Sequence, residues 1–146
     1  MRLEQYQLEA DATFMTFEFI SEGPKGKIDK LIIYSETPVK GIYNLAFGDK
    51  ISNTNEIDDL VVTDNKDSEK VLATVVASIY SFTNEYPKAR VVLAGSTKAR
   101  TRLYRMGISI YFEELNDDFF ITGYINNKWV IFDRNINFEA FSVKRK

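Results

Sequence analysis

The sequence predicts a single α+β domain, residues 1–146, with a mixed and mostly antiparallel sheet and two main helices in the order βββ(β)αβαββ. Near both ends of the chain, apolar side chains alternate between two faces as they do in strands, and in the middle they recur at helical spacing. These two patterns predict this fold class. With 146 residues, 45% of them hydrophobic and 27% charged, the chain has the profile of one globular domain with a sizeable core.

The first third of the chain predicts an antiparallel meander. TFMTFEFI at residues 13–20 alternates apolar side chains between two faces, and GPKG at residues 23–26 supplies a turn. KIDKLIIY at residues 27–34 reads as the return strand, and IYNLAFG at residues 42–48 alternates again.

A helix and a central strand follow. Asp67 or Ser68 is a natural N-cap for a helix to about Asn84. Its apolar positions recur at helical spacing and should pack on the sheet: Leu72, Val75, Val76, Ile79 and either Phe82 or Thr83. The uninterrupted apolar run Val91–Ala94 is typical of a strand covered on both faces.

The second helix is expected to start at Ser96 or Thr97 and to continue to about Leu115, with Gly107 as a weak point. The helical projection gives a core stripe, made of Ala99, Leu103, Met106 and Ile110. The opposite, solvent side carries Lys98, Arg102 and Arg105, whereas Arg100, Tyr104 and Tyr111 lie on one flank of the core stripe. The four cations therefore do not form one patch.

The C-terminal part predicts a hairpin. FFITGYI and KWVIF are separated by Asn126-Asn127, and asparagine tolerates the positive φ angles of a type I′ turn. Residues 138–143 are expected to add an edge strand before the basic end Lys144-Arg145-Lys146.

Composition excludes several classes of function. The chain contains neither cysteine nor histidine, which removes disulfides, thiolate nucleophiles, the usual zinc ligands and the commonest general base. We therefore expect no cofactor and favour a binding protein over an enzyme.

The net charge of −2 argues against a chain that coats nucleic acid through its overall charge. The absence of a signal-like start and of long apolar runs predicts a cytoplasmic protein with no membrane partner.

The stretch from Asp49 to Lys70 holds seven acidic residues and three lysines. It lacks the glycine and the distant glutamate of a calcium-binding loop, so we interpret the acids as solvated loop and helix-start residues without a metal. The alternative is a metal-dependent, nuclease-like factor that acts through carboxylates such as Asp58, Asp59 and Asp64.

A candidate binding site lies where the strand Val91–Ala94 feeds the second helix through Gly95-Ser96-Thr97. Free backbone N–H groups at a helix N-terminus favour a phosphate or a carboxylate, and an arginine can add a bidentate contact. The expected ligand-binding residues are Ser96, Thr97, Arg100 and Tyr104. The alternative is a turn that only caps the helix, since no P-loop or dinucleotide motif is present.

Two resemblances add to this interpretation. YNLAFGD at residues 43–49, EKVLATV at residues 69–75 and GSTKARTRLYRMGI at residues 95–108 resemble an uncharacterised bacterial family, found largely in Bacteroidetes, which implies no activity. KARTRLYRMGI is also similar to a helix of GNAT-type N-acyltransferases, and this likeness implies that Tyr104 would serve as general acid. The turn at residues 64–68 lacks the glycines by which that superfamily holds the cofactor pyrophosphate.

The sequence thus predicts a cytoplasmic binding or interaction protein whose Ser96–Tyr104 region engages an anionic or phosphate-bearing partner, which could be a small ligand, a nucleic acid or a protein. One setting for it is half of a bacterial two-gene defence or toxin–antitoxin module. The alternative is a degenerate or divergent GNAT-type acyltransferase.

Overall fold

The computed structural model describes residues 4–58, 63–95 and 97–146. Its contacts divide the chain into two compact units: unit 1 comprises Met1–Tyr34 and Ala46–Glu85, and unit 2 comprises Ser35–Leu45 and Tyr86–Lys146. The described residues form three helices and eight strands, so the α+β class is confirmed. That the two units act as a single domain stays a prediction.

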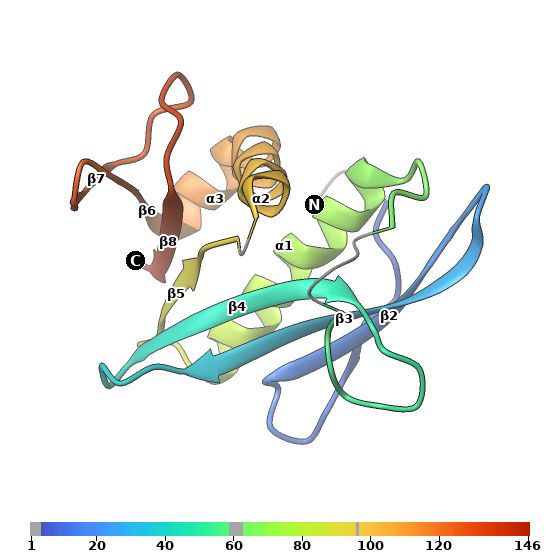
Figure 1. Cartoon of the computed structure of the whole chain (residues 1–146). Helices are drawn as coiled ribbons and strands as arrows, with labels where there is room; N and C mark the ends of the chain where they lie inside the picture. The colour runs from blue at the N-terminus through green and yellow to red at the C-terminus, as the bar shows by residue number, and fades with distance from the viewer. Residues whose placement is uncertain (1–3, 59–62, 96) are drawn as a thin grey trace. The chain divides into compact units, whose positions relative to one another are not determined.

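Unit 1 is built from strands β1 (Glu9–Ala10) and β2 (Thr16–Gly23), most of β3 (Gly26–Glu36) and helix α1 (Ser68–Glu85) (Figure 1). The three strands pair antiparallel in chain order, as the predicted meander requires for β2 and β3, whereas β1 was not expected. Helix α1 is anchored on the sheet by Phe82, whose ring stacks on Tyr34 of β3 with centroids 4.1 Å apart. The predicted first helix is confirmed.

Unit 2 contains the end of β3 and the first half of β4 (Ile42–Asp49), whereas the second half of β4 belongs to unit 1. The remaining elements are β5 (Arg90–Leu93), α2 (Lys98–Ile110), α3 (Phe112–Asp118), β6 (Phe119–Ile125), β7 (Lys128–Ile131) and β8 (Ala140–Arg145). Their strand order is β4-β5-β8-β6-β7. β4 and β5 pair in parallel, and β5–β8, β8–β6 and β6–β7 are antiparallel. β5 is therefore an interior strand, as its apolar run predicted. It is not covered on both faces, however, because Val92 is only half-buried and Ala94 is exposed.

The β6–β7 hairpin is confirmed, because Asn126 and Asn127 have φ angles of 53° and 62°. The expectation of an edge strand at residues 138–143 is wrong. β8 lies between β5 and β6, and β7 is the edge strand. Ala140–Val143 are all buried, which suits an interior position and not an edge.

The second predicted helix is two helices, and the break lies at Tyr111 instead of Gly107. Tyr111 has φ −101° and ψ 18°, and its N–H still bonds to the Gly107 carbonyl. None of the helices in the described ranges is long and apolar enough to cross a bilayer.

The expected core stripe of α2 is also wrong. Ala99, Met106 and Ile110 are exposed, and Leu103 is half-buried. The buried residues of α2 are Arg100, Tyr104, Gly107 and Ile108. A tyrosine ring and an arginine stem bring more apolar surface to an interface than Ala99 does, and Gly107 has no side chain to hold the backbone away.

Candidate functional site

The chain passes from β5 into α2 through a turn that Thr97 closes. Thr97 is the N-cap, and its Oγ1 accepts a hydrogen bond from the Arg100 backbone N–H at 3.2 Å. A Cβ on Gly95 would come within 2.4 Å of the Thr101 backbone nitrogen, so the turn requires glycine there. The predicted helix start at Thr97 is confirmed, whereas Ser96 lies outside the described residues.

The expected ligand-binding side chains differ in their access to solvent. Arg100 is 7% exposed and Tyr104 is 4% exposed, while Thr97 is exposed, as are the neighbouring Lys98 and Arg102. The N–H groups of Lys98 and Ala99 precede the first intrahelical bond and lie at the positive end of the helix dipole. Solvent therefore reaches Thr97 and Lys98 at the amino end of α2, whereas the side chains of Arg100 and Tyr104 are almost fully covered.

Arg105 has a structural partner far along the chain. Its guanidinium donates to the Asn137 side chain and, at 2.8 Å, to the Arg134 carbonyl. Arg134 in turn donates to the Ser109 carbonyl at 3.0 Å and lies 5.0 Å from the centre of the Phe112 ring. Arg105, expected on the solvent side, thus ties α2 to the loop that precedes β8.

Charge is divided unevenly between the two units. Unit 2 contains twelve Lys and Arg residues against seven Asp and Glu, a net charge of +5. Unit 1 contains seven Lys and Arg residues against fourteen Asp and Glu, a net charge of −7. The small charge of the whole chain is the sum of two opposite halves, so it says little about what unit 2 attracts.

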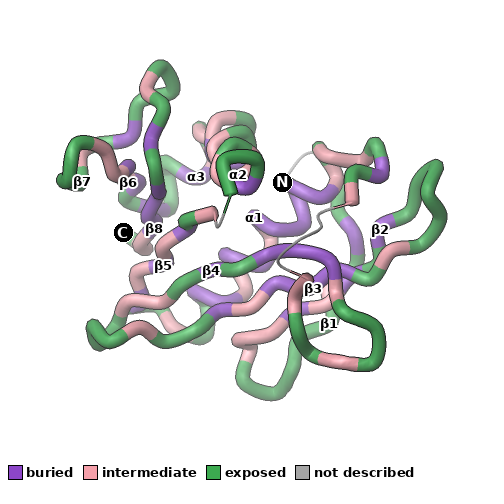
Figure 2. The backbone as a smooth tube through the Cα atoms, viewed as in Figure 1, coloured by how far each residue is buried: buried purple, intermediate pink, exposed green. Residues whose placement is uncertain are grey.

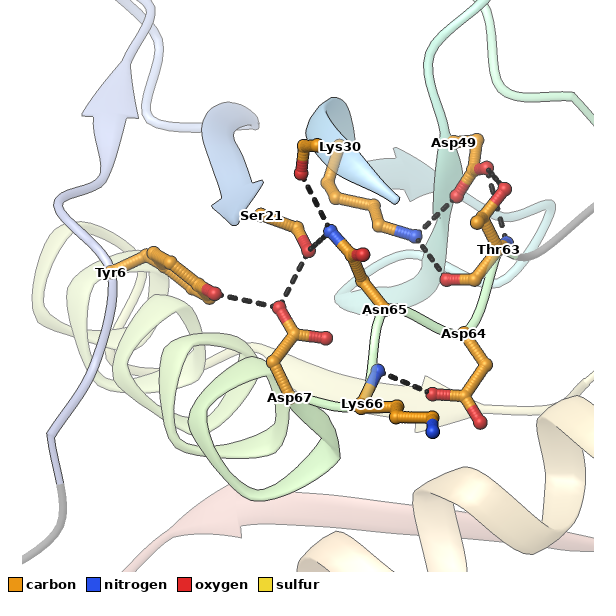
Figure 3. A network of polar contacts seen from close by, with 10 residues as sticks. Tyr6, Ser21, Lys30, Asp49, Thr63, Asp64, Asn65, Lys66 and Asp67 are labelled. Carbon is orange, nitrogen blue, oxygen red and sulfur yellow. Dashed lines mark hydrogen bonds and ion pairs between the residues drawn. The ribbon is translucent and has the colours of Figure 1, made fainter. Parts of the chain in front are cut away.

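Unit 1 holds a buried polar network (Figure 3). Lys30 is 2% exposed, pairs with Asp49 and donates to the Thr63 carbonyl at 3.0 Å. The second carboxylate oxygen of Asp49 accepts from the Thr63 N–H at 3.1 Å and from its hydroxyl at 2.6 Å. The interpretation of Asp49 as a solvated loop acid is therefore wrong, because the ion pair compensates for its burial.

The same network continues to the start of α1 (Figure 3). Asp67 accepts hydrogen bonds from the Tyr6 hydroxyl at 2.6 Å and from Ser21 Oγ at 2.5 Å. The Asn65 amide donates to Ser21 Oγ at 3.2 Å and to the Gly26 carbonyl at 2.8 Å. Ser21, Lys30 and Asn65 are all buried, so these contacts support the fold of unit 1.

Tyr6 gives this network a pH dependence. Burial raises the pKa of the Tyr6 phenol, and the hydrogen bond to the Asp67 carboxylate raises this pKa further. A raised folded-state pKa contributes stability that is present below the ordinary value of about 10 and is lost as the pH rises through the folded value.

We expect Tyr6→Phe to cost about 1–2 kcal/mol of unfolding free energy near neutral pH, since Asp67 loses a donor. Above about pH 10 the wild type should lose stability faster than the variant, so the two should converge. Urea unfolding of both proteins across this pH range is the measurement. Parallel pH profiles would show that Tyr6 does not carry the effect.

The acidic stretch before α1 forms no metal site among the described residues, where no three carboxylates are placed to hold an ion. Asp64 accepts a hydrogen bond from the Lys66 backbone N–H at 2.9 Å and is exposed. Asp59, which the nuclease-like alternative also requires, lies outside the described residues.

Comparison with known proteins places the chain in a family. Residues 2–146 match the model described as Family of unknown function (DUF6934). The chain belongs to this family. No curated protein matches it, and no solved structure does. The expected likeness to an uncharacterised family is thereby confirmed, and the description of DUF6934 carries no activity.

Proposed function

We propose that this DUF6934 chain is a binding protein that engages an anionic, phosphate-bearing partner through unit 2, at the turn between β5 and α2. The observation that carries the proposal is the charge division, with +5 on unit 2 and −7 on unit 1. A partner rich in phosphate is attracted to unit 2 and repelled by unit 1, so it favours contact with unit 2.

The amino end of α2 supplies the contact. The N–H groups of Lys98 and Ala99 point out of the helix start, where the dipole favours an anion, and exposed Lys98 adds a full charge. Thr97 fixes the turn through its cap on the Arg100 N–H.

The cellular setting is part of the same proposal. A cytoplasmic, two-gene bacterial defence or toxin–antitoxin module would provide a phosphate-bearing or protein partner of this kind. The acyltransferase alternative gains no support from the site, because Tyr104, its expected general acid, is almost fully buried. Acetyl-CoA therefore serves as a comparison ligand in the test.

The test is a thermal unfolding titration with inorganic phosphate at constant ionic strength. Phosphate at about ten times its Kd should stabilise the wild type by roughly 1.4 kcal/mol, a shift of a few degrees in Tm. The shift should disappear in Lys98→Glu. It should persist in Lys40→Glu, which changes the charge of unit 2 equally at an exposed loop position.

Equal stabilisation of the wild type and Lys98→Glu by phosphate would show that the β5–α2 turn only caps the helix. Stabilisation by acetyl-CoA beyond that by phosphate at the same concentration would favour the acyltransferase alternative instead.

A further inference from the structure

The sheet of unit 2 has two unlike faces. One face is covered by the helices, since α2 contacts β8 and α3 contacts β6 (Figure 1). Its side chains are buried and apolar: Val91, Leu93, Phe119, Ile121, Phe141 and Val143. Because side chains alternate along a strand, the residues between these lie on the opposite face. We call that opposite face the open face.

The strand register fixes which residues meet on the open face. Arg90 pairs with Lys144, and Lys144 pairs with Phe120, so these three form one row across β5, β8 and β6. At the other end of β6, Tyr124 pairs with Ala140 on one side and with Trp129 on the other.

Aromatic rings stand exposed on the open face. Phe120 is 57% exposed and Trp129 is 45% exposed, and neighbouring Ile131 on the edge strand is 84% exposed. The Trp129 ring lies 5.1 Å from the ring of Tyr124. Phe120 is four residues from Tyr124 along β6, about 13 Å at the rise of a strand. Figure 2 shows β7 as mostly exposed.

Cations lie among these rings. The Arg90 guanidinium donates to Ser142 Oγ at 3.1 Å, so the Arg90 side chain lies on the open face and extends from β5 toward β8. The Lys146 amino group lies 5.7 Å from the centre of the Phe120 ring, on the same face as Lys144. Among the described residues of β5, β6, β7 and β8 that share the open face, none is an Asp or a Glu.

We propose that the open face binds single-stranded nucleic acid, with bases stacked on Phe120 and Trp129 and phosphates held by Arg90, Lys144 and Lys146. Every base offers a π-face to an exposed ring, and single strands leave those faces accessible, whereas a duplex does not. A groove of cations beside such rings then follows the backbone.

A second copy of the chain fits this surface less well. In a two-fold interface the open face meets the open face of a second copy, whose strand residues include no Asp or Glu to pair with Arg90, Lys144 and Lys146. The open face is separate from the amino end of α2, which belongs to a helix on the other face of these strands. The inference therefore goes beyond the proposed function and can fail without it.

The experiment is a titration of the full chain with fluorescein-labelled oligouridylate and oligodeoxythymidylate, followed by anisotropy. Trp129 is the sole tryptophan of the chain, so quenching of its emission by unlabelled oligonucleotide reports stacking at the open face directly. Three neutralised phosphates predict a log–log salt slope of about −2. The two sugars separate an RNA partner from a DNA partner, and binding of either supports the proposal.

Variants localise the binding. Phe120→Ala and Trp129→Leu should each weaken it roughly 5- to 100-fold, while Trp129→Phe, which keeps a π-face, should retain most of it. Ile20→Ala removes an exposed apolar side chain from unit 1 and should change nothing. Circular dichroism of each variant verifies that it is folded.

Several results would overturn the proposal. They are an absence of binding to both oligonucleotides, binding that Phe120→Ala and Trp129→Leu leave intact, and binding that only Lys98→Glu removes, which would assign it to the amino end of α2. Sedimentation that shows a dimer dissociated by Trp129→Leu, without oligonucleotide binding, would instead identify the open face as an interface between copies.

Discussion

Lys30→Met is expected to lower the unfolding free energy by about 3–5 kcal/mol, because it leaves the Asp49 carboxylate buried without its counter-charge. The methionine fills much of the space of the lysine stem, so the loss reports on charge and not on a cavity. Thr63 still donates twice to Asp49, which holds the carboxylate in place without neutralising it.

Urea unfolding of the wild type and of three variants, Lys30→Met among them, measures this effect. Lys30→Met combined with Asp49→Leu removes both charges and should recover most of the lost stability. Lys27→Met breaks an exposed ion pair with Glu22 and should stay within about 1 kcal/mol of wild type. A Lys30→Met protein as stable as Lys27→Met would show that the buried pair contributes nothing.

Asp67→Ala is expected to cost about 2–4 kcal/mol, since it removes a charged acceptor from both the Tyr6 hydroxyl and Ser21 Oγ. These two bonds connect the N-terminal segment and β2 to the start of α1. The segment around Tyr6 should therefore open more readily than the rest of unit 1.

Amide hydrogen exchange tests this second expectation. The Tyr6 N–H donates to Thr74 Oγ1 at 2.8 Å, so its protection reports whether the segment remains docked on α1. Protection should fall in Asp67→Ala and stay unchanged in Asp64→Ala, which alters an exposed carboxylate in the same loop. Unchanged Tyr6 protection in Asp67→Ala would contradict the role given to Asp67.

Features set by neighbouring residues could be predicted from the sequence. The Asn126-Asn127 turn follows from the two asparagines alone, because few other residues adopt positive φ. The spacing of apolar residues from Leu72 to Phe82 predicts α1, and Thr97 was one of the two N-caps expected for α2.

Features set by distant pairing could not be predicted. β8 follows the β6–β7 hairpin in sequence but lies between β5 and β6, a choice that no local pattern encodes. The network partners Tyr6 and Asp67 are 61 residues apart, and Arg105 and Asn137 are 32 residues apart. In α2, the positions of the apolar residues predicted the wrong buried face. Arg100 and Tyr104 are counted as polar residues, yet their long side chains are buried in the structure.

The candidate site was likewise predicted only in part from the sequence. Its residue types and the exposure of Lys98 were predicted from GSTKAR and the helical projection, and Arg100, expected on the flank of the core stripe, is buried. The charge division depends on which segments fold together, so the net charge of the chain concealed it. The open face likewise follows only from the register of four strands.

Chemical-shift mapping of the ¹⁵N-labelled chain tests most directly whether unit 2 is the surface that receives anionic partners. Inorganic phosphate should move the amides of Lys98 and Ala99, and a single-stranded oligonucleotide should move those of β6, β7 and β8, with unit 1 unaffected. Shifts confined to unit 1, or no shifts with either ligand at saturating concentration, would contradict the proposed function.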